Sequence, residues 1–339
     1  MWPKNLKKAS EILTTECAIF LSISLLFYAL STLFFQGHFL LRKSHWKGRG
    51  HRTLQIGMGI HALGLGLHFL LSGQPPFSNM LVVISLLVIV LLLAGLLIER
   101  FSRLSLGLLL SPLALLGLLY PMLMPVRFEE AESILLRYPW LGVHVFISMF
   151  GLVGFALAFC TAITYLVQVR FLKRGRLNNY LPALDTSASA TYRFAAIGFS
   201  VFTLGLGMGL IWLFGAPGEY LQARDTKIWM ALPTWLMFAV YLYLCGIGRR
   251  HGSRLKWLVI FGFLLALANL FGVRHNFVNT LQTSELLKRI PGHAKVAICG
   301  SETGSAKEEI LSGSTILSAR GPLPEILKKT LASIPRPRA

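Results

Sequence analysis

The sequence has little charge, and most of it is of one sign. Only 14% of its 339 residues are charged, 54% are hydrophobic, and the mean hydropathy is +0.63. A soluble domain usually has about 25% charged residues, so an ordinary soluble fold is excluded. Lys and Arg outnumber Asp and Glu by 33 to 14, for a net charge of +19. These cations cluster in short connections between apolar runs, as membrane topology requires, and we therefore expect no nucleic-acid partner.

Several reactive motifs are missing. The four cysteines, Cys17, Cys160, Cys245 and Cys299, form no Cys-x-x-Cys pair and no Cys-x-x-Cys-His haem-attachment motif. This excludes a c-type cytochrome and argues against a disulfide framework. The chain also lacks a Gly-rich phosphate loop, a His-Glu-x-x-His zinc pattern and any evident nucleophile–base arrangement. We therefore expect a protein that binds and orients a partner rather than an enzyme.

Long apolar runs are what the sequence has in quantity. They are about 20 residues long, the length at which a helix crosses roughly 30 Å of hydrocarbon with its backbone groups bonded internally. We predict an all-α, polytopic membrane helix bundle with about eight transmembrane helices. The first run lacks a cleavage site and is expected to be retained, and the aliphatic third and fourth are expected to face lipid. The expected spans are 17–37, 53–73, 79–98, 104–124, 140–168, 192–216, 229–248 and 255–274.

The cations predict an orientation for this bundle. Most lie in the connections after the first, third, fifth and seventh spans, which the positive-inside rule places in the cytoplasm. Both termini then lie outside a bacterial inner (plasma) membrane, although three lysines near the N-terminus oppose this. We divide the chain into an N-terminal four-helix membrane region (1–136), a four-helix core with an outer loop (137–280), and a polar, basic tail (281–339). The composition of the tail suggests disorder.

Histidines are informative because ionisable residues inside spans are costly. Those at 38, 45, 51 and 251 lie beside many cations in the expected cytoplasmic connections, and we interpret them as solvated. Within the second span, Gly57, His61, Gly64 and His68 share one helical face. This face fits either close helix packing with hydrogen-bonded histidines or contact with haem or a quinone. His61 is therefore a candidate intramembrane ligand.

Two further histidines reach the expected outer face from different helices. His144 opens the fifth span and His275 closes the eighth. Neutral imidazole is a good iron ligand, and two imidazoles can hold one haem iron axially. Basic groups near this face can pair with haem propionates or anchor the helices at the interface. These residues are Arg224, Lys227 and Arg274, with Tyr220, Asp225 and Trp229 beside them.

Residues 138–278 resemble a known family through a combination of motifs. The sixth span carries Tyr192-Arg193, Gly198-Phe199, Thr203, Gly205, Gly209 and Trp212; Asp225, Lys227 and Trp229 follow in the outer loop, and Thr234-Trp235 in the next helix. Together these are similar to the core of the cytochrome c assembly family, of the CcsA/CcmC type. In this resemblance His144 corresponds to the family's first outer haem histidine.

The resemblance implies a protein that holds haem (haem b) or moves it across the membrane for attachment to apocytochrome c, with another biogenesis membrane subunit as partner. We expect His144 and His275 as axial ligands, Trp229 and Tyr220 beside the macrocycle, and basic residues on the propionates. His275 lies nearer to the Gly-Val element than the family's second histidine usually does. The loop departs from the family pattern, because Arg224 stands at a Trp position and Ile228 at the Glu position. This departure favours the HemX-like branch. A haem-free scaffold and a transporter of another substrate stay open.

Overall fold

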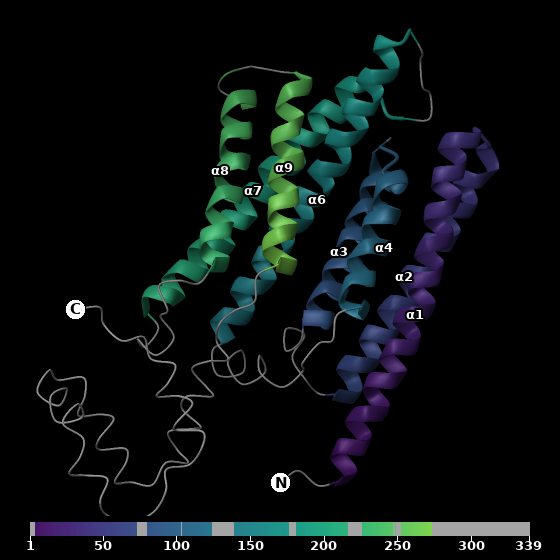
Figure 1. The fold of residues 1–339 in the computed structure, drawn as a ribbon, viewed down its shortest axis with the longest axis vertical. Coiled ribbons are helices and arrows are strands. Elements are labelled where there is room, and N and C mark those ends of the chain that lie inside the picture. The colour runs from purple at the N-terminus through teal and green to yellow at the C-terminus, as the bar shows by residue number, and fades with distance from the viewer. Residues whose placement is uncertain are drawn as a thin grey trace, which may run out of the picture. The chain divides into compact units, whose positions relative to one another are not determined.

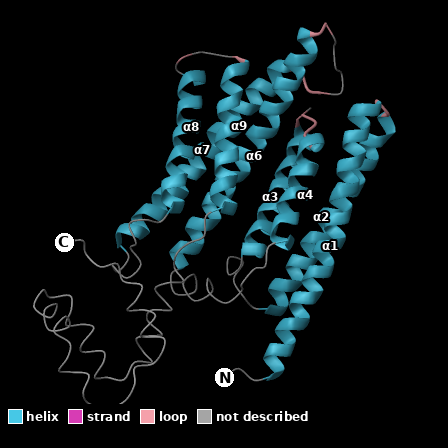
Figure 2. Ribbon diagram, viewed as in Figure 1, coloured by secondary structure: helices cyan, strands magenta, loops and turns pink. Residues whose placement is uncertain are grey.

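Helices make up all the regular structure of the described residues (Figure 2). The structure, a computed structural model, describes residues 4–72, 80–102, 104–123, 139–175, 181–215, 226–246, 248 and 252–272. The predicted all-α membrane bundle is confirmed, whereas the tail 281–339 lies outside the described residues. The helices are α1 (Lys4–Leu41), α2 (Ser44–Ser72), α3 (Met80–Phe101), α4 (Gly107–Leu123), α6 (Pro139–Lys173), α7 (Leu184–Gly215), α8 (Thr226–Gly246) and α9 (Ser253–Gly272).

Seven of these helices are long and apolar enough to cross a membrane, and α4 is a shorter apolar helix over Gly107–Tyr120. Some extend beyond the expected spans: α1 and α6 have 38 and 35 residues, or about 57 and 52 Å at 1.5 Å per residue.

The connection between α1 and α2 is only Arg42 and Lys43. Arg42 adopts the left-handed backbone conformation, with φ of 56°, that commonly ends a helix. His38 therefore lies on α1 and His45 and His51 on α2, and the expectation that these three histidines occupy a loop is wrong.

Successive helices pack as antiparallel hairpins, α1 with α2, α3 with α4, α6 with α7, and α8 with α9 (Figure 1). The α3–α4 hairpin contacts α1 and α2 on one side and, through α3, α6 on the other. One face of α3 is buried, including Ile84 and Leu92, and so is one face of α4, including Leu110 and Leu118. The expectation that these two helices face lipid is therefore wrong for these faces. Lipid and protein neighbours are both apolar, so composition does not distinguish them.

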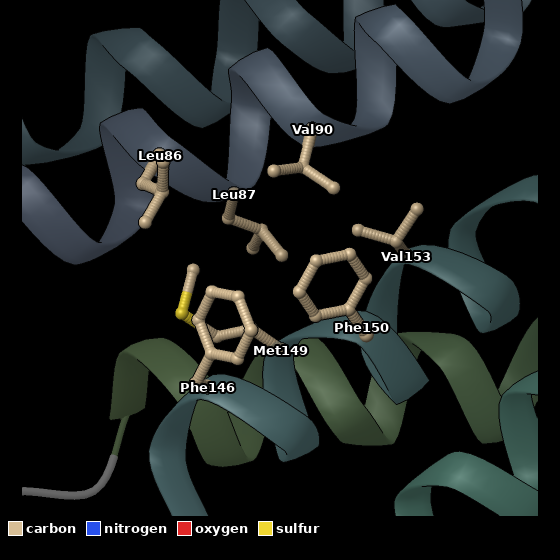
Figure 3. A pocket seen from close by; sticks show the side chains of 7 residues that line it. All are labelled: Leu86, Leu87, Val90, Phe146, Met149, Phe150 and Val153. Atoms are coloured by element: carbon tan, nitrogen blue, oxygen red, sulfur yellow. The ribbon is translucent and has the colours of Figure 1, made fainter. Parts of the chain in front are cut away.

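Phenylalanine side chains fill the contact between α3 and α6 (Figure 3). Phe146, Met149 and Phe150 of α6 face Leu86, Leu87 and Val90 of α3, around a gap of about 10 Å³. This volume holds no more than about one water molecule. The contact is therefore a packing seam. It also shows that α3 and α6 run in the same direction, since residue numbers rise together along both helices.

Candidate functional site

The candidate site begins at a close crossing of α6 and α7. A Cβ added to Gly154 would lie 2.5 Å from the Cα of Gly198, and one added to Gly151 would lie 2.7 Å from the Cα of Phe202. Neither position has room for a side chain, so the two backbones touch. Small residues allow membrane helices to approach in this way. Toward the start of α6, the same crossing brings this helix onto Gly205 and Gly209 of α7.

His144 occupies the surface that these glycines leave open. Its Nδ1 lies 2.6 Å from the carbonyl oxygen of Gly205. A Cβ added to Gly209 would lie 2.7 Å from Cε1 and 2.9 Å from Nδ1 of the same ring. A carbonyl oxygen only accepts hydrogen bonds, so Nδ1 carries the proton and the neutral ring has its lone pair on Nε2. Metal-binding histidines commonly donate their other ring N–H to a backbone carbonyl in this way. The donor chemistry of His144 therefore fits an iron ligand.

Residues of the family-like motif meet behind this histidine. The indole Nε1 of Trp235 on α8 donates to Thr203 Oγ1 on α7 at 2.9 Å, and Thr203 donates in turn to the carbonyl oxygen of Phe199 at 2.7 Å. Phe155 of α6 stacks on Phe238 of α8, with ring centroids 3.6 Å apart and an interplanar angle of 7°. These contacts hold α8 against both α6 and α7.

Helix direction brings four chain segments to the same end of this core. Along α6 and α9, Phe159 lies against Phe263 with ring centroids 4.7 Å apart, and Tyr165 lies 5.2 Å from the Lys256 Nζ. The two helices are therefore antiparallel. Gly272, the last residue of α9, lies nine residues beyond Phe263, at about the level of Phe150 and so about 9 Å of helix rise from His144. Since α6 and α7 are also antiparallel, α7 ends near the level at which α6 begins, and α8 starts near that level too. We call this the His144 end of the bundle.

The structure describes part of the predicted outer site. It places His144, half-buried, and Trp229, which is 64% exposed on the first turn of α8. Within the described residues, no group of three or more His, Cys, Asp or Glu side chains is placed to hold a metal ion. A haem does not need such a group, because the porphyrin supplies four of the iron ligands. Lys227 lies on α8, whereas Tyr220, Arg224, Asp225, Arg274 and His275 lie outside the described residues.

The second-span candidate, His61, is fully buried between α2 and α1. Its Nδ1 lies 3.0 Å from the Tyr28 hydroxyl, and its Nε2 is buried with no hydrogen-bond partner among the described residues. A Cβ added to Gly57 would lie 2.8 Å from the Cβ of Phe27. A Cβ added to Gly64 would lie 2.5 Å from the Cβ of Phe20. The glycines of this face therefore receive aromatic side chains of α1, as the helix-packing interpretation predicts.

A buried lysine was not found by sequence reasoning. Lys256 counts among the cytoplasmic cations in the sequence, but it is 4% exposed on α9. Its Nζ donates to the Tyr241 hydroxyl at 3.0 Å and lies 5.2 and 5.4 Å from the ring centroids of Tyr165 and Tyr241. The tyrosines thus replace water around this cation. Its partners are far apart in the sequence, so no local pattern reveals the cluster.

Comparison with known proteins places these features in a family. The family described as "Cytochrome C assembly protein" matches residues 77–278. "Cytochrome c biogenesis protein CcsA" of Guillardia theta is 28% identical over 231 residues, covering 62% of this chain and 76% of that protein. The protein of the same description in Chlorella vulgaris is 28% identical over 249 residues, covering 62% and 78%.

A second kind of relative is "Protein HemX" of Brevibacillus brevis, 30% identical over 159 residues, covering 46% of this chain and 58% of that protein. No solved structure matches the chain significantly. The matched family region covers more than half of the chain and contains α3 to α9, including His144 and the α6–α7 crossing. The chain therefore belongs to the cytochrome c assembly protein family.

Proposed function

We propose that the protein holds haem at the His144 end of the bundle and delivers it for cytochrome c biogenesis at the outer face of the membrane. The observation that carries this proposal is the setting of His144. The Gly205 carbonyl oxygen fixes its tautomer and Gly209 makes room for its ring, so Nε2 is the nitrogen with a lone pair for iron. Membership of a cytochrome c assembly family supplies the reason to expect haem.

We assign the second axial ligand to His275. It follows Gly272, the last residue of α9, by three residues, and three trans peptide units span at most about 11 Å between Cα atoms. Because α9 ends about 9 Å of helix rise from His144, this chain length is compatible with two imidazoles on one iron. Cationic side chains near this end would pair with the propionates. The other residues of the proposed site are Arg224, Lys227, Arg274, Asp225, Tyr220 and Trp229.

His61 is our proposed intramembrane ligand on the path of haem transfer. Its support is the buried Nε2 that has no partner among the described residues. The Tyr28 hydroxyl can accept from Nδ1–H, which would leave the Nε2 lone pair for a metal. An unsatisfied buried nitrogen costs about 1–3 kcal/mol, so its retention suggests a use.

The protein's part in the chemistry is to bind and orient. Bound haem (haem b) would supply the vinyl groups that react with thiols of apocytochrome c. The proposed partners are apocytochrome c and a second biogenesis membrane subunit. We also propose an inner-membrane location with both termini outside, and a division into 1–136, 137–280 and 281–339, which separates α1–α4 from α6–α9. A topology reporter fused after Gly218 should read as external, and a cytoplasmic signal would reverse the orientation.

The absorbance spectrum of detergent-purified protein tests the haem proposal. We expect a Soret band that is shifted or lost in the His144→Ala and His275→Ala variants. The matched control is His45→Ala, because His45 is exposed on the first turn of α2. A Soret band that is unchanged in all three variants would place haem elsewhere and refute the ligand assignment.

The second candidate function is a HemX-like scaffold that affects haem synthesis without binding haem. Two observations favour it: the similarity to the HemX protein of Brevibacillus brevis, and the position of α1 and α2 before the family match, which begins at residue 77. The spectrum separates the two functions. A colourless protein that co-purifies with a partner enzyme would support the scaffold and contradict the haem proposal.

A further inference from the structure

A groove of about 630 Å³ lies between the first turns of α2, the end of α3 and the start of α4. Since α3 and α6 run in the same direction, this end of α3 is opposite the His144 end of the bundle. The floor of the groove is apolar, with Leu93, Leu96, Leu97 and Leu104. Its rim is polar and consists of Lys47, His51, Gln55, Glu99, Arg100, Ser102 and Ser105.

The one carboxylate in the rim is engaged within the protein. Glu99 Oε1 accepts from the backbone N–H groups of Leu106 and of Gly107, the latter at 2.8 Å, at the start of α4. Its Oε2 lies 3.4 Å from His51 Nδ1. A carboxylate at a helix N-terminus satisfies otherwise unpaired N–H groups there. Glu99 therefore acts as a helix cap, and the interpretation of His51 as simply solvated is wrong.

The two strong cations of the rim are left without a carboxylate. Among the described residues, the ion pair between His51 and Glu99 is the only one, so neither Lys47 nor Arg100 has an acidic partner. Lys47 comes from α2 and Arg100 from α3, on different sides of the groove. The Ser105 hydroxyl lies in the same rim, whereas the Ser102 hydroxyl donates to the Ile98 carbonyl oxygen at 2.6 Å. This set of groups suits a phosphodiester, which carries one negative charge and several acceptor oxygens.

We propose that this groove binds an anionic phospholipid, with its phosphate between Lys47 and Arg100 and its acyl chains on the leucine floor. The α3 span runs from Val82 to Phe101, so the rim lies where a membrane span ends and headgroups begin. Leu93 and Leu97 of the floor are 47% and 48% exposed, and Phe101 beyond them is 85% exposed. Basic pockets between membrane helices are a known setting for anionic headgroups.

The apolar floor decides between a lipid and a soluble anion. A free phosphate would use the cations alone, whereas the acyl chains of a lipid would also cover Leu93 and Leu97, which are half-exposed. A single headgroup between Lys47 and Arg100 would also join α2 to α3. The site does not depend on which face of the membrane is cytoplasmic, or on whether the protein binds haem.

Thermal unfolding of the full-length protein in detergent, with added phosphatidylglycerol or phosphatidylcholine, tests the proposal on the unaltered chain. We expect phosphatidylglycerol to raise the Tm and phosphatidylcholine to have little effect. Native mass spectrometry should show one retained phosphatidylglycerol. Equal shifts with the two lipids would overturn the proposal, as would an equal shift with inorganic phosphate. If haemin displaces the retained lipid and gives a Soret band that depends on His51, the groove binds haem, and the lipid proposal is overturned.

The matched variants are Lys47→Gln/Arg100→Gln and, as control, Lys43→Gln/Arg52→Gln. Both lose two positive charges, but Lys43 lies 5.3 Å from the Trp46 ring centroid, and neither Lys43 nor Arg52 lines the groove. One interfacial cation contributes about fivefold to anionic-lipid affinity, so we expect a loss of about 30-fold in the groove variant and little in the control. Equal losses would indicate general surface attraction and overturn the proposal. If the groove variant does not fold, Lys47→Arg/Arg100→Lys should keep lipid selectivity, and its loss there would count against the site.

Discussion

Replacing Gly209 by Ala tests whether α7 positions His144 for a ligand. The added Cβ would lie 2.7 Å from Cε1 and 2.9 Å from Nδ1 of the imidazole, whereas nonbonded carbon atoms prefer about 3.5 Å or more. The ring must therefore move by about 0.6 to 0.8 Å. Such a movement lengthens or breaks the 2.6 Å hydrogen bond to the Gly205 carbonyl oxygen. The substitution thus displaces the proposed ligand without removing it.

The expected effect on haem binding is larger than the effect on folding. Losing a partner that orients a metal-binding histidine typically costs 10- to 100-fold in affinity, and we expect a loss in that range. Gly to Ala within a helix gains about 1 kcal/mol of helix propensity, which offsets part of the contact strain. The Tm should therefore change little while haem affinity falls.

Titration of haemin into apoprotein, followed at the Soret band, measures this difference. The matched control is Gly207→Ala on the same helix, where no atom of the described residues lies within 4 Å of the added Cβ. It changes helix propensity equally and leaves His144 undisturbed. A haem affinity that is unchanged in both variants would refute the positioning of His144 by α7. An equal loss of affinity in both variants would indicate a general effect on α7 and would also count against it.

Three further substitutions test single contacts. Tyr28→Phe removes the only side-chain hydrogen bond of His61 among the described residues and should lower the free energy of unfolding by about 1–3 kcal/mol in denaturant titrations; an unchanged midpoint would mean that the two groups do not interact. Trp235→Phe removes the donor to Thr203 Oγ1 and should cost about 1 kcal/mol, with the Thr203→Val double variant less than additive; full additivity would contradict the bond. Glu99→Ala uncovers the N–H groups that begin α4 and should cost about 1 kcal/mol, seen as faster hydrogen exchange at those amides; unchanged exchange would contradict the cap.

The sequence alone predicted the membrane bundle and singled out His144, the proposed haem ligand. Apolar runs of about 20 residues report the thickness of the hydrocarbon, so the spans were visible without tertiary information. His144 stood out because it opens a span at a membrane face. The same reasoning missed Lys256, because its tyrosine partners come from α6 and α8 and approach only when those helices pack.

Length and apolarity are local properties of a chain, and they determined the helices, their approximate ends and the family resemblance. Which face of each helix meets another helix was decided only by the tertiary structure. One face of each of the uniformly aliphatic helices α3 and α4 packs against other helices, and Gly205 and Gly209 hold an imidazole. The physical reason is that lipid and protein neighbours are equally apolar, so hydropathy cannot distinguish a lipid-facing side from a protein-facing side. Only the close packing of segments that are distant in the sequence shows which side is buried.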